Sequence, residues 1–245
     1  MIKLFAVEWI KIRRLKIWIL MLIGPLLGIL FGISNYFGNY EVFMGPGDNG
    51  WIEAWTQLQI FYGPLILPIL TGIYSALICR SEHIGGGWKQ LLALPIKRSQ
   101  VYLSKLTLVF VLLAFTQLLM VVLYIPAGLI TGIPGELPWL DLLKFAMLGC
   151  IASLPLATIQ MIVSTHWRSF GVPLAINIGF AIPAFILSYT KYGQYYPWAL
   201  PNLAMSPADE APIQSYPVFY GIVISVFIIA LFIGLRVFTK KDMHS

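Results

Sequence analysis

Six long runs of apolar residues constrain the fold of this chain more than any other feature of its sequence. A helix of about 20 apolar residues crosses a hydrocarbon core of roughly 30 Å and satisfies its own backbone hydrogen bonds there. The composition agrees, since 59% of the residues are hydrophobic and 11% are charged, whereas a soluble domain has about 25% charged residues. The sequence therefore predicts an all-α membrane protein. The six predicted transmembrane helices span residues 17–37, 58–79, 106–131, 142–165, 172–189 and 218–238.

We expect residues 1–245 to form a single transmembrane domain, in which residues 1–16 precede the first span as a helix at the membrane surface. The basic residues predict its orientation. Fourteen of the sixteen Lys and Arg residues fall on the side of the two termini, and seven acidic residues fall on the other. Because cytoplasmic loops carry an excess of Lys and Arg, both termini are predicted to be cytoplasmic. The formal net charge of +6 then reflects membrane topology rather than nucleic-acid binding.

The tryptophans support the same topology. Aromatic rings with a polar edge prefer the boundary between water and lipid, and all eight tryptophans fall near the ends of predicted spans. We expect four at the cytoplasmic boundary and four at the outer one. The first group is Trp9, Trp18, Trp88 and Trp167, and the second is Trp51, Trp55, Trp139 and Trp198.

The N-terminal segment has the pattern of an amphipathic helix that lies on the membrane. Its apolar residues share one arc at helical spacing, and its charged residues occupy the opposite arc, where the basic ones would face anionic headgroups. Such a helix either anchors the first span or offers a docking surface to a cytoplasmic partner. The residues that we assign to this helix include Glu8, Trp9, Lys11, Arg13 and Arg14.

The inner loop between the second and third spans contains a short predicted helix. Ile84, Trp88 and Leu91 follow helical spacing and, with Leu92, would form one apolar stripe. Three glycines break the chain before this helix, and Pro95 ends it because proline lacks the backbone N–H. Ser99 is then expected to cap the third span. The helix either transmits a movement of a soluble motor protein to the membrane spans or only leads the chain back to the bilayer.

This loop resembles the first cytoplasmic loop of the type-2 class of ABC exporter permeases. The shared pattern is an acid, a glycine-rich step, an aromatic-Lys pair, a Leu-rich stretch ending in proline, and a basic segment. Here the residues are Glu82, Gly85, Gly86, Gly87, Trp88, Lys89, Leu91, Leu92, Leu94, Pro95, Lys97, Arg98, Tyr102 and Lys105. The segment Glu8-Trp9-Ile10-Lys11 resembles the family's interfacial helix, and the start of the first span is most similar to lantibiotic-protection and bacitracin-resistance permeases.

The resemblance implies a specific assembly. Two permease subunits, identical or paralogous, would pair above two ABC ATPase subunits, and ATP-driven closure would expel an amphiphilic substrate. The inner-loop helix would be the coupling helix that sits in a groove of the ATPase. Trp88 and Leu91 offer apolar anchors of the hot-spot type, and Glu82 and Lys89 add charges that can pair. The expected coupling residues are Glu82, Gly85, Gly86, Gly87, Trp88, Lys89, Leu91, Leu92 and Pro95.

The sequence offers little for catalysis by the chain itself. It contains no phosphate-binding loop of the form G-x-x-x-x-G-K-[ST], so any ATP and Mg²⁺ would bind a separate subunit. His83, His166 and His244 lie at predicted helix edges or in the tail, without the spacing of a metalloprotease motif. We therefore expect no catalytic residues, no bound metal and no cofactor on this chain.

An ion-coupled carrier would place ionisable groups at the midplane of its spans. Here the predicted spans hold neutral polar residues, which either line a path for an amphiphile or join helices to one another. Aromatic residues in the outer segment after the fifth span either anchor it or contact an emerging peptide. The candidate path residues are Gln117, Gln160, Asn177, Tyr195, Tyr196 and Trp198.

With these features, the resemblance implies a permease subunit in a bacterial plasma membrane that exports an amphiphilic antimicrobial peptide. The alternatives are an exporter of another hydrophobic compound, an ion-coupled carrier and a non-transporting scaffold.

Overall fold

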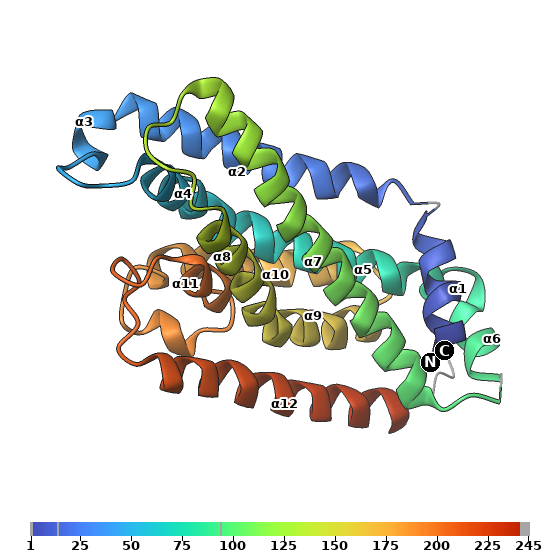
Figure 1. The fold of residues 1–245 in the computed structure, drawn as a ribbon. Coiled ribbons are helices and arrows are strands. Elements are labelled where there is room, and N and C mark those ends of the chain that lie inside the picture. The colour runs from blue at the N-terminus through green and yellow to red at the C-terminus, as the bar shows by residue number, and fades with distance from the viewer. Residues whose placement is uncertain (1, 14, 94, 241–245) are drawn as a thin grey trace.

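The computed structural model describes residues 2–13, 15–93 and 95–240, without the side chains of residues 2, 3, 85, 89, 92 and 93. Every regular element in this part of the chain is a helix (Figure 1). The α-helices are α1 (Ile2–Arg13), α2 (Ile17–Gly38), α3 (Tyr40–Phe43), α4 (Gly50–Phe61), α5 (Leu67–His83), α6 (Gly87–Ala93), α7 (Arg98–Thr131), α8 (Trp139–Ala152), α9 (Leu154–His166), α10 (Gly171–Leu187), α11 (Leu200–Met205) and α12 (Tyr216–Lys240). A π-helical turn, η1 (Tyr62–Ile66), and two 3₁₀ turns, η2 (Ile84–Gly86) and η3 (Gly193–Tyr195), complete them.

Five helical segments in the described residues are long and apolar enough to cross a membrane, judged by length and composition. They are Ile17–Gly38, Gly50–His83, Arg98–Thr131, Trp139–His166 and Tyr216–Lys240. The predicted fifth span corresponds to α10, which has 17 residues and lies at the short end of the range for a spanning helix. The structure thus supports five of the six predicted spans directly.

The second span begins eight residues earlier than predicted. Asn49 caps α4, because its side-chain oxygen accepts a hydrogen bond from the backbone N–H of Trp51 at 2.9 Å. The span then passes through η1, which contains Pro64, and continues in α5, which has Pro68 in its first turn. The π-helical turn therefore coincides with the part of the span that contains these two prolines.

The third span also begins earlier than predicted, at Arg98 rather than near residue 106. Its N-cap position is Lys97, and no side chain caps the helix there. The expected cap by Ser99 is therefore wrong, since this residue already lies within the first turn. In the fourth span the helix is interrupted at Ser153, directly before the turn of α9 that contains Pro155.

Three glycines at four-residue spacing let α2 approach its neighbours closely. A Cβ atom on Gly24 would lie 2.6 Å from the Leu70 side chain, and one on Gly28 would lie 3.0 Å from Tyr62. At Gly32 a Cβ would meet backbone, 2.6 Å from the amide nitrogen of Leu58 and against its Cα. Small residues at this spacing allow membrane helices to pack with their backbones close together, and here they hold α2 against the second span.

Half of the tryptophans that we expect at the membrane boundaries do not expose their rings. Trp51, Trp55, Trp88 and Trp198 are buried inside the protein. The Trp55 indole donates a hydrogen bond to the carbonyl of Met205 at 3.0 Å, which ties α4 to the short helix α11. Because a buried indole N–H needs a partner, such contacts replace the interfacial water that the prediction assumed.

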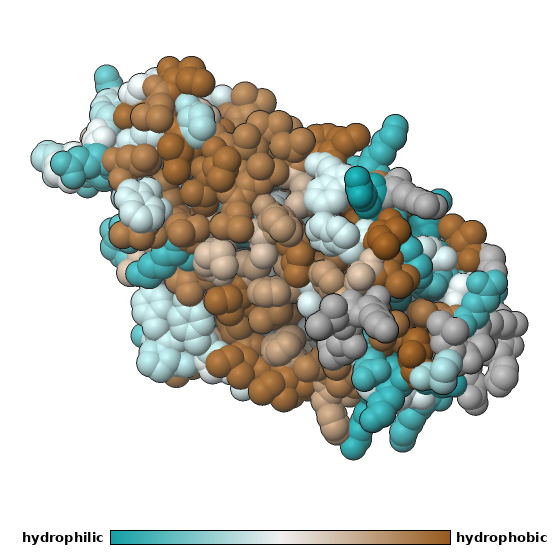
Figure 2. All heavy atoms as spheres, turned by 45° about the vertical axis from the view of Figure 1, so that its right-hand side comes forward, coloured by the Kyte–Doolittle hydropathy of each residue, from teal (hydrophilic) through white to brown (hydrophobic). Residues whose placement is uncertain are grey.

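The outer surface of the bundle is strongly apolar. Figure 2 shows a broad hydrophobic band between more hydrophilic ends, and α2 and α12 contribute many of its exposed side chains. An apolar surface of this extent suits contact with lipid or with another membrane subunit. The exposed residues on these two helices include Leu22, Leu26, Leu30, Ile224, Ile228 and Phe232.

The two ends of the bundle differ in construction. Helices α1 and α6 lie together at one end, where α7 begins and α12 finishes, and α3 and α11 lie towards the other (Figure 1). At the first end, the Arg98 guanidinium donates a hydrogen bond to the carbonyl of Thr239 at 3.1 Å. This contact joins the first turn of α7 to the last turn of α12.

Replacing Gly32 with alanine tests the close packing of α2. The new methyl group meets backbone that cannot rotate away, so we expect the free energy of unfolding to fall by about 1–3 kcal/mol. Gly38→Ala is the control, because a Cβ there has nothing within 4 Å. Thermal unfolding of the two purified variants in detergent measures the difference. Equal stability of the variants would contradict the packing described.

Candidate functional site

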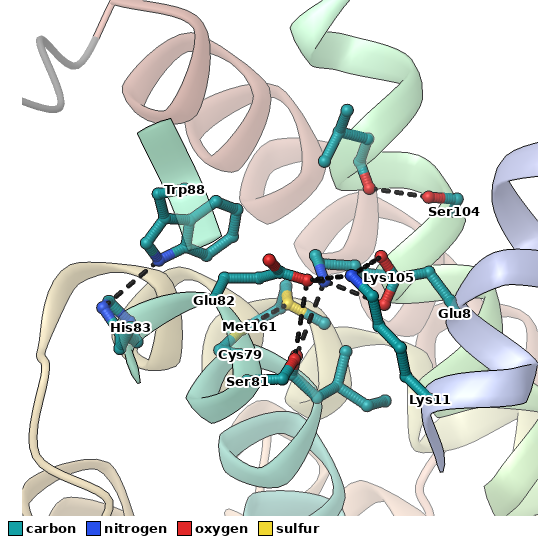
Figure 3. Close-up of polar contacts among 12 residues, drawn as sticks. Glu8, Lys11, Cys79, Ser81, Glu82, His83, Trp88, Ser104, Lys105 and Met161 are labelled. Atoms are coloured by element: carbon teal, nitrogen blue, oxygen red, sulfur yellow. Dashed lines mark hydrogen bonds and ion pairs between the residues drawn. The ribbon is translucent and has the colours of Figure 1, made fainter. Parts of the chain in front are cut away.

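A cluster of four charged side chains, three of them buried, lies at the end of the bundle that carries α6 (Figure 3). The ammonium group of Lys105 is fully buried and lies 2.8 Å from Glu8 Oε2 and 3.0 Å from Glu82 Oε1. Lys11 completes the cluster from its edge, with Nζ 2.6 Å from the same Glu82 oxygen. Two carboxylates and two ammonium groups thus balance each other in charge.

Three separate segments of the chain supply these residues. Glu8 and Lys11 lie one turn apart on α1, Glu82 lies near the end of α5, and Lys105 lies two turns into α7. The cluster therefore joins the N-terminal helix to two spans. Removing a charge from water costs several kcal/mol, which attraction repays only when the pairs are short and well hydrogen-bonded. The ion pairs therefore hold these three segments in one arrangement, in addition to the apolar contacts between them.

Helix α6 is attached to this cluster through Trp88. The Lys105 ammonium lies 5.4 Å from the centre of the Trp88 ring, a distance at which a cation is attracted to the aromatic face. The same ring packs edge-on against Phe238 of α12, with centroids 5.3 Å apart. Trp88 therefore connects α6 both to the ion cluster and to the end of the last span.

A second connection runs from Trp88 through His83. The indole N–H donates to His83 Nδ1 at 3.2 Å, and His83 Nε2 lies 3.0 Å from the carbonyl oxygen of Ser164. Because Nδ1 accepts the first bond, Nε2 carries the proton and donates to Ser164. This relay fixes the neutral imidazole in one tautomer and links α6 to the end of α9.

The predicted short helix is present as α6, but its apolar stripe is not arranged as expected. Trp88 is 5% exposed, so its ring does not form the outward-facing anchor that the sequence suggested. Ile84 lies in η2 and is 62% exposed. Leu91 is half-buried and packs against the central core. The stripe fails because Gly86 adopts a left-handed conformation, with φ of +73°, which separates Ile84 from the helix that follows.

The other predicted coupling residues surround this attachment. Gly87 begins α6 so close to Glu82 that a Cβ would lie 2.8 Å from its Oε2 atom, and Pro95 is exposed beyond the helix. The structure does not describe the side chains of Lys89 and Leu92 or the exposure of Gly85.

The N-terminal helix also differs from its prediction. Glu8 is expected on the polar face of this helix, but it is 4% exposed and pairs with Lys105. Trp9 packs edge-on against Trp18 at a centroid distance of 5.6 Å. Arg13 is exposed, and Arg14 lies outside the described residues. The apolar and charged arcs of α1 are therefore both used in contacts with the bundle.

The candidate path residues form two buried polar networks and an exposed remainder. Asn177 accepts hydrogen bonds from Gln160 at 2.9 Å and from the Trp198 indole at 2.8 Å, and its amide donates to the carbonyl of Pro68. These contacts join α5, α9 and α10 to the segment before α11.

Gln117 forms the second network. Its oxygen accepts a hydrogen bond from the Tyr62 hydroxyl at 2.7 Å, and its nitrogen donates to the carbonyl of Ala146 at 3.2 Å. Tyr196 donates to the carbonyl of Phe180, and Tyr195 is exposed. In this conformation the amides join helices, which is the second of the two roles considered from the sequence.

Lys105 is the central residue of the cluster, and the sequence analysis gave it no role of its own. Its position was a usable signal, since a lysine followed by a long apolar run is costly unless it is paired. Glu8 was a second signal, because it is the sole acid among the basic residues that precede the first span. Sequence alone did not reveal that these two would meet, because they are 97 positions apart.

The described residues contain no group of three or more His, Cys, Asp or Glu side chains that could hold a metal ion. Cys79 and Cys150 are both buried as free thiols.

Comparison with known proteins places this arrangement in a family. A family model described as "ABC-2 family transporter protein" matches residues 4–184, a region that includes α1, the ion cluster, α6 and most of α10. Comparisons with curated proteins and with solved structures gave no match. Because the family model covers well over half of the chain, this protein belongs to the ABC-2 family of membrane transporter proteins.

Proposed function

We propose that this chain is the permease subunit of an ATP-driven exporter, and that α6 passes the motion of an ABC ATPase subunit into the membrane helices. Membership of the ABC-2 family implies partnership with ABC ATPase subunits. The finer assembly that we propose has two permeases above two ATPases, with ATP and Mg²⁺ bound by the ATPases alone. The permease itself performs no catalytic step.

The observation that carries this proposal is the attachment of α6 to the ion cluster. A short helix that merely returned the chain to the bilayer would need no fixed link to distant spans. Trp88 instead contacts Lys105 of α7 and Phe238 of α12, and it reaches α9 through His83. A displacement of α6 would therefore act on three helices at once, as a transmission element requires.

The position of α6 also decides the topology that we propose. An ATPase in the cytoplasm would meet α6, and this places α1 and the end of α12 on the cytoplasmic side of a bacterial plasma membrane. In this topology α10 is the sixth span, short enough to need local thinning of the bilayer or help from its neighbours. Both termini are then cytoplasmic.

We further propose that the substrate is an amphiphilic antimicrobial peptide of the lantibiotic type, and that its export confers protection or resistance. An amphiphile dissolved in the membrane can approach the apolar flanks of α2 and α12 from the bilayer. The buried amides of Gln117, Gln160 and Asn177 would become available to it only when the helices that they join move apart. In this proposal the polar networks keep the path closed in the present conformation.

An ion-coupled carrier is less well supported by the arrangement of charges. Its coupling ion would need an ionisable group that is alternately exposed near the midplane. The buried charges described here instead lie near one end of their helices and neutralise one another. They suit a structural joint better than an ion path.

Trp88→Ala tests the coupling role. Because Trp88 is internal, we expect the ATPase to co-purify with the variant, whereas hydrolysis stimulated through the permease falls by about fivefold or more. The measurement combines affinity co-purification with ATP hydrolysis by the reconstituted complex.

Trp167→Ala is the matched control, because this tryptophan is 46% exposed and follows α9 at the same end of the molecule. It should retain both readouts. If Trp88→Ala also keeps full stimulation and full co-purification, the coupling role assigned to α6 is wrong.

Peptide tolerance tests the substrate class. Cells that lack this chain should become more sensitive to amphiphilic antimicrobial peptides, and tolerance should return with the wild-type chain or Trp167→Ala but not with Trp88→Ala. Growth inhibition across a broad peptide panel provides the measurement. Unchanged sensitivity to the whole panel would rule out this substrate class while leaving the coupling experiment unaffected.

A further inference from the structure

An open apolar groove lies between α1 and the third span, α7. Its volume is about 400 Å³, within the roughly 300–1,000 Å³ of pockets that hold small molecules. Every side chain that lines it is apolar, and those of Ile10 and Phe115 are 57% and 48% exposed. The lining residues are Phe5, Ala6, Trp9, Ile10, Val111 and Phe115.

Aromatic contacts and one ion pair hold the two walls of the groove together. The rings of Phe5 and Trp9 stack with centroids 6.2 Å apart, and the Trp9 ring lies 6.3 Å from that of Phe115 on α7. Beside Trp9, the carboxylate of Glu8 pairs with Lys105 of α7 at 2.8 Å (Figure 3). The groove is therefore part of a firm joint between α1 and α7.

The groove lies on the membrane side of the ion cluster. Val111 and Phe115 follow Lys105 by about two and three turns along α7, and this helix is long and apolar enough to cross a bilayer. In a membrane that α7 crosses, the groove is consequently at a depth where acyl chains are available to fill it.

A positive charge stands at one end of this groove. At about 100° per residue, Arg13 falls on the same arc of α1 as Trp9 and Ile10, one turn further along the helix. Arg13 is exposed and forms no ion pair with a described acid. Lys16, just beyond the helix, is exposed as well. The one acid of α1, Glu8, is buried and already paired.

We propose that the groove binds one anionic phospholipid, with an acyl chain along the apolar lining and the phosphate against Arg13. A guanidinium group on the apolar arc of a membrane-surface helix needs an anion or a route to water, and it binds phosphate through paired N–H donors. The lipid would brace α1 against α7 and so support the pairing of Glu8 with Lys105.

A second copy of the chain fits the groove less well. Its strongly exposed apolar helices, α2 and α12, contain no acidic residue that could meet Arg13. The lipid proposal requires only that the chain lies in a membrane, and it does not depend on the export function. Its test uses the permease without ATPase, so failure here leaves the coupling experiment unaffected.

Photolabelling of the purified permease in detergent tests the proposal. The probe is phosphatidylglycerol with a photoreactive diazirine in one acyl chain, and mass spectrometry identifies the labelled peptides. We expect saturable labelling of α1 and of α7 around Val111 and Phe115. Unlabelled phosphatidylglycerol should compete about tenfold better than phosphatidylcholine, because two exposed basic residues favour a lipid with net negative charge.

Ala6→Phe tests the acyl-chain contact. Ala6 is exposed and lines the groove, so a larger side chain fills the space without changing any charge. Affinity for phosphatidylglycerol should fall about tenfold, because excluding two methylene groups of the chain is enough for this loss. Val7→Phe is the matched control, since Val7 is the next residue, is 49% exposed and does not line the groove.

Arg13→Gln tests the headgroup contact independently. Affinity for phosphatidylglycerol should fall about fivefold, as for one basic residue near an anionic headgroup, while affinity for phosphatidylcholine changes little. Arg168→Gln, at an exposed arginine after α9, should bind as the wild type does. Raising the salt concentration to about 1 M should narrow the preference for phosphatidylglycerol more in the wild type than in Arg13→Gln, because salt screens exposed charges.

Several results would overturn the proposal. Labelling that does not saturate, or equal competition by the two lipids, would show that no anionic lipid is selected. Unchanged labelling of Ala6→Phe would place the lipid elsewhere. Loss of a permease dimer in Ala6→Phe with unchanged lipid labelling, measured by size-exclusion chromatography with light scattering, would instead assign the groove to a second copy of the chain.

Discussion

The burial of Lys105 between Glu8 and Glu82 is the interaction on which the rest of this structure depends. A fully buried ammonium group is tolerated only when carboxylates stand within hydrogen-bond distance, so α1 and α5 cannot leave α7 without exposing an unpaired charge. The distances of 2.8 and 3.0 Å meet that requirement. This constraint fixes the N-terminal helix to the bundle and defines the surface on which α6 rests.

The attachment of α6 follows from that constraint. Trp88 needs a partner for its indole N–H and a surface for its ring, and it finds them in His83, Phe238 and the Lys105 ammonium group. The ring that a sequence pattern would assign to docking is thereby used inside the permease. In the coupling role that we propose, docking on an ATPase would fall to the exposed residues of η2 and α6, and Trp88 would transmit their displacement to the spans.

Periodicity and composition predicted the helical fold, the position of most spans and the short helix between Gly86 and Pro95, because these depend on local residue patterns. The ends of helices were less predictable. Asn49 extended the second span by its capping bond, and α7 begins at Arg98 without a side-chain cap that the sequence could have shown. The ion cluster could not be predicted, since Glu8 and Lys105 meet only after the chain has folded.

A double-mutant cycle between Glu82 and Lys105 measures the central claim most directly. Each single change, Glu82→Gln or Lys105→Met, leaves a net buried charge, whereas the double change leaves Glu8 paired with Lys11. Thermal stability and ATPase stimulation should therefore recover in the double variant relative to the sum of the single effects, with a coupling energy in stability of about 0.5–3 kcal/mol. Additive losses in both readouts would contradict the account, because they would show that the two residues act independently.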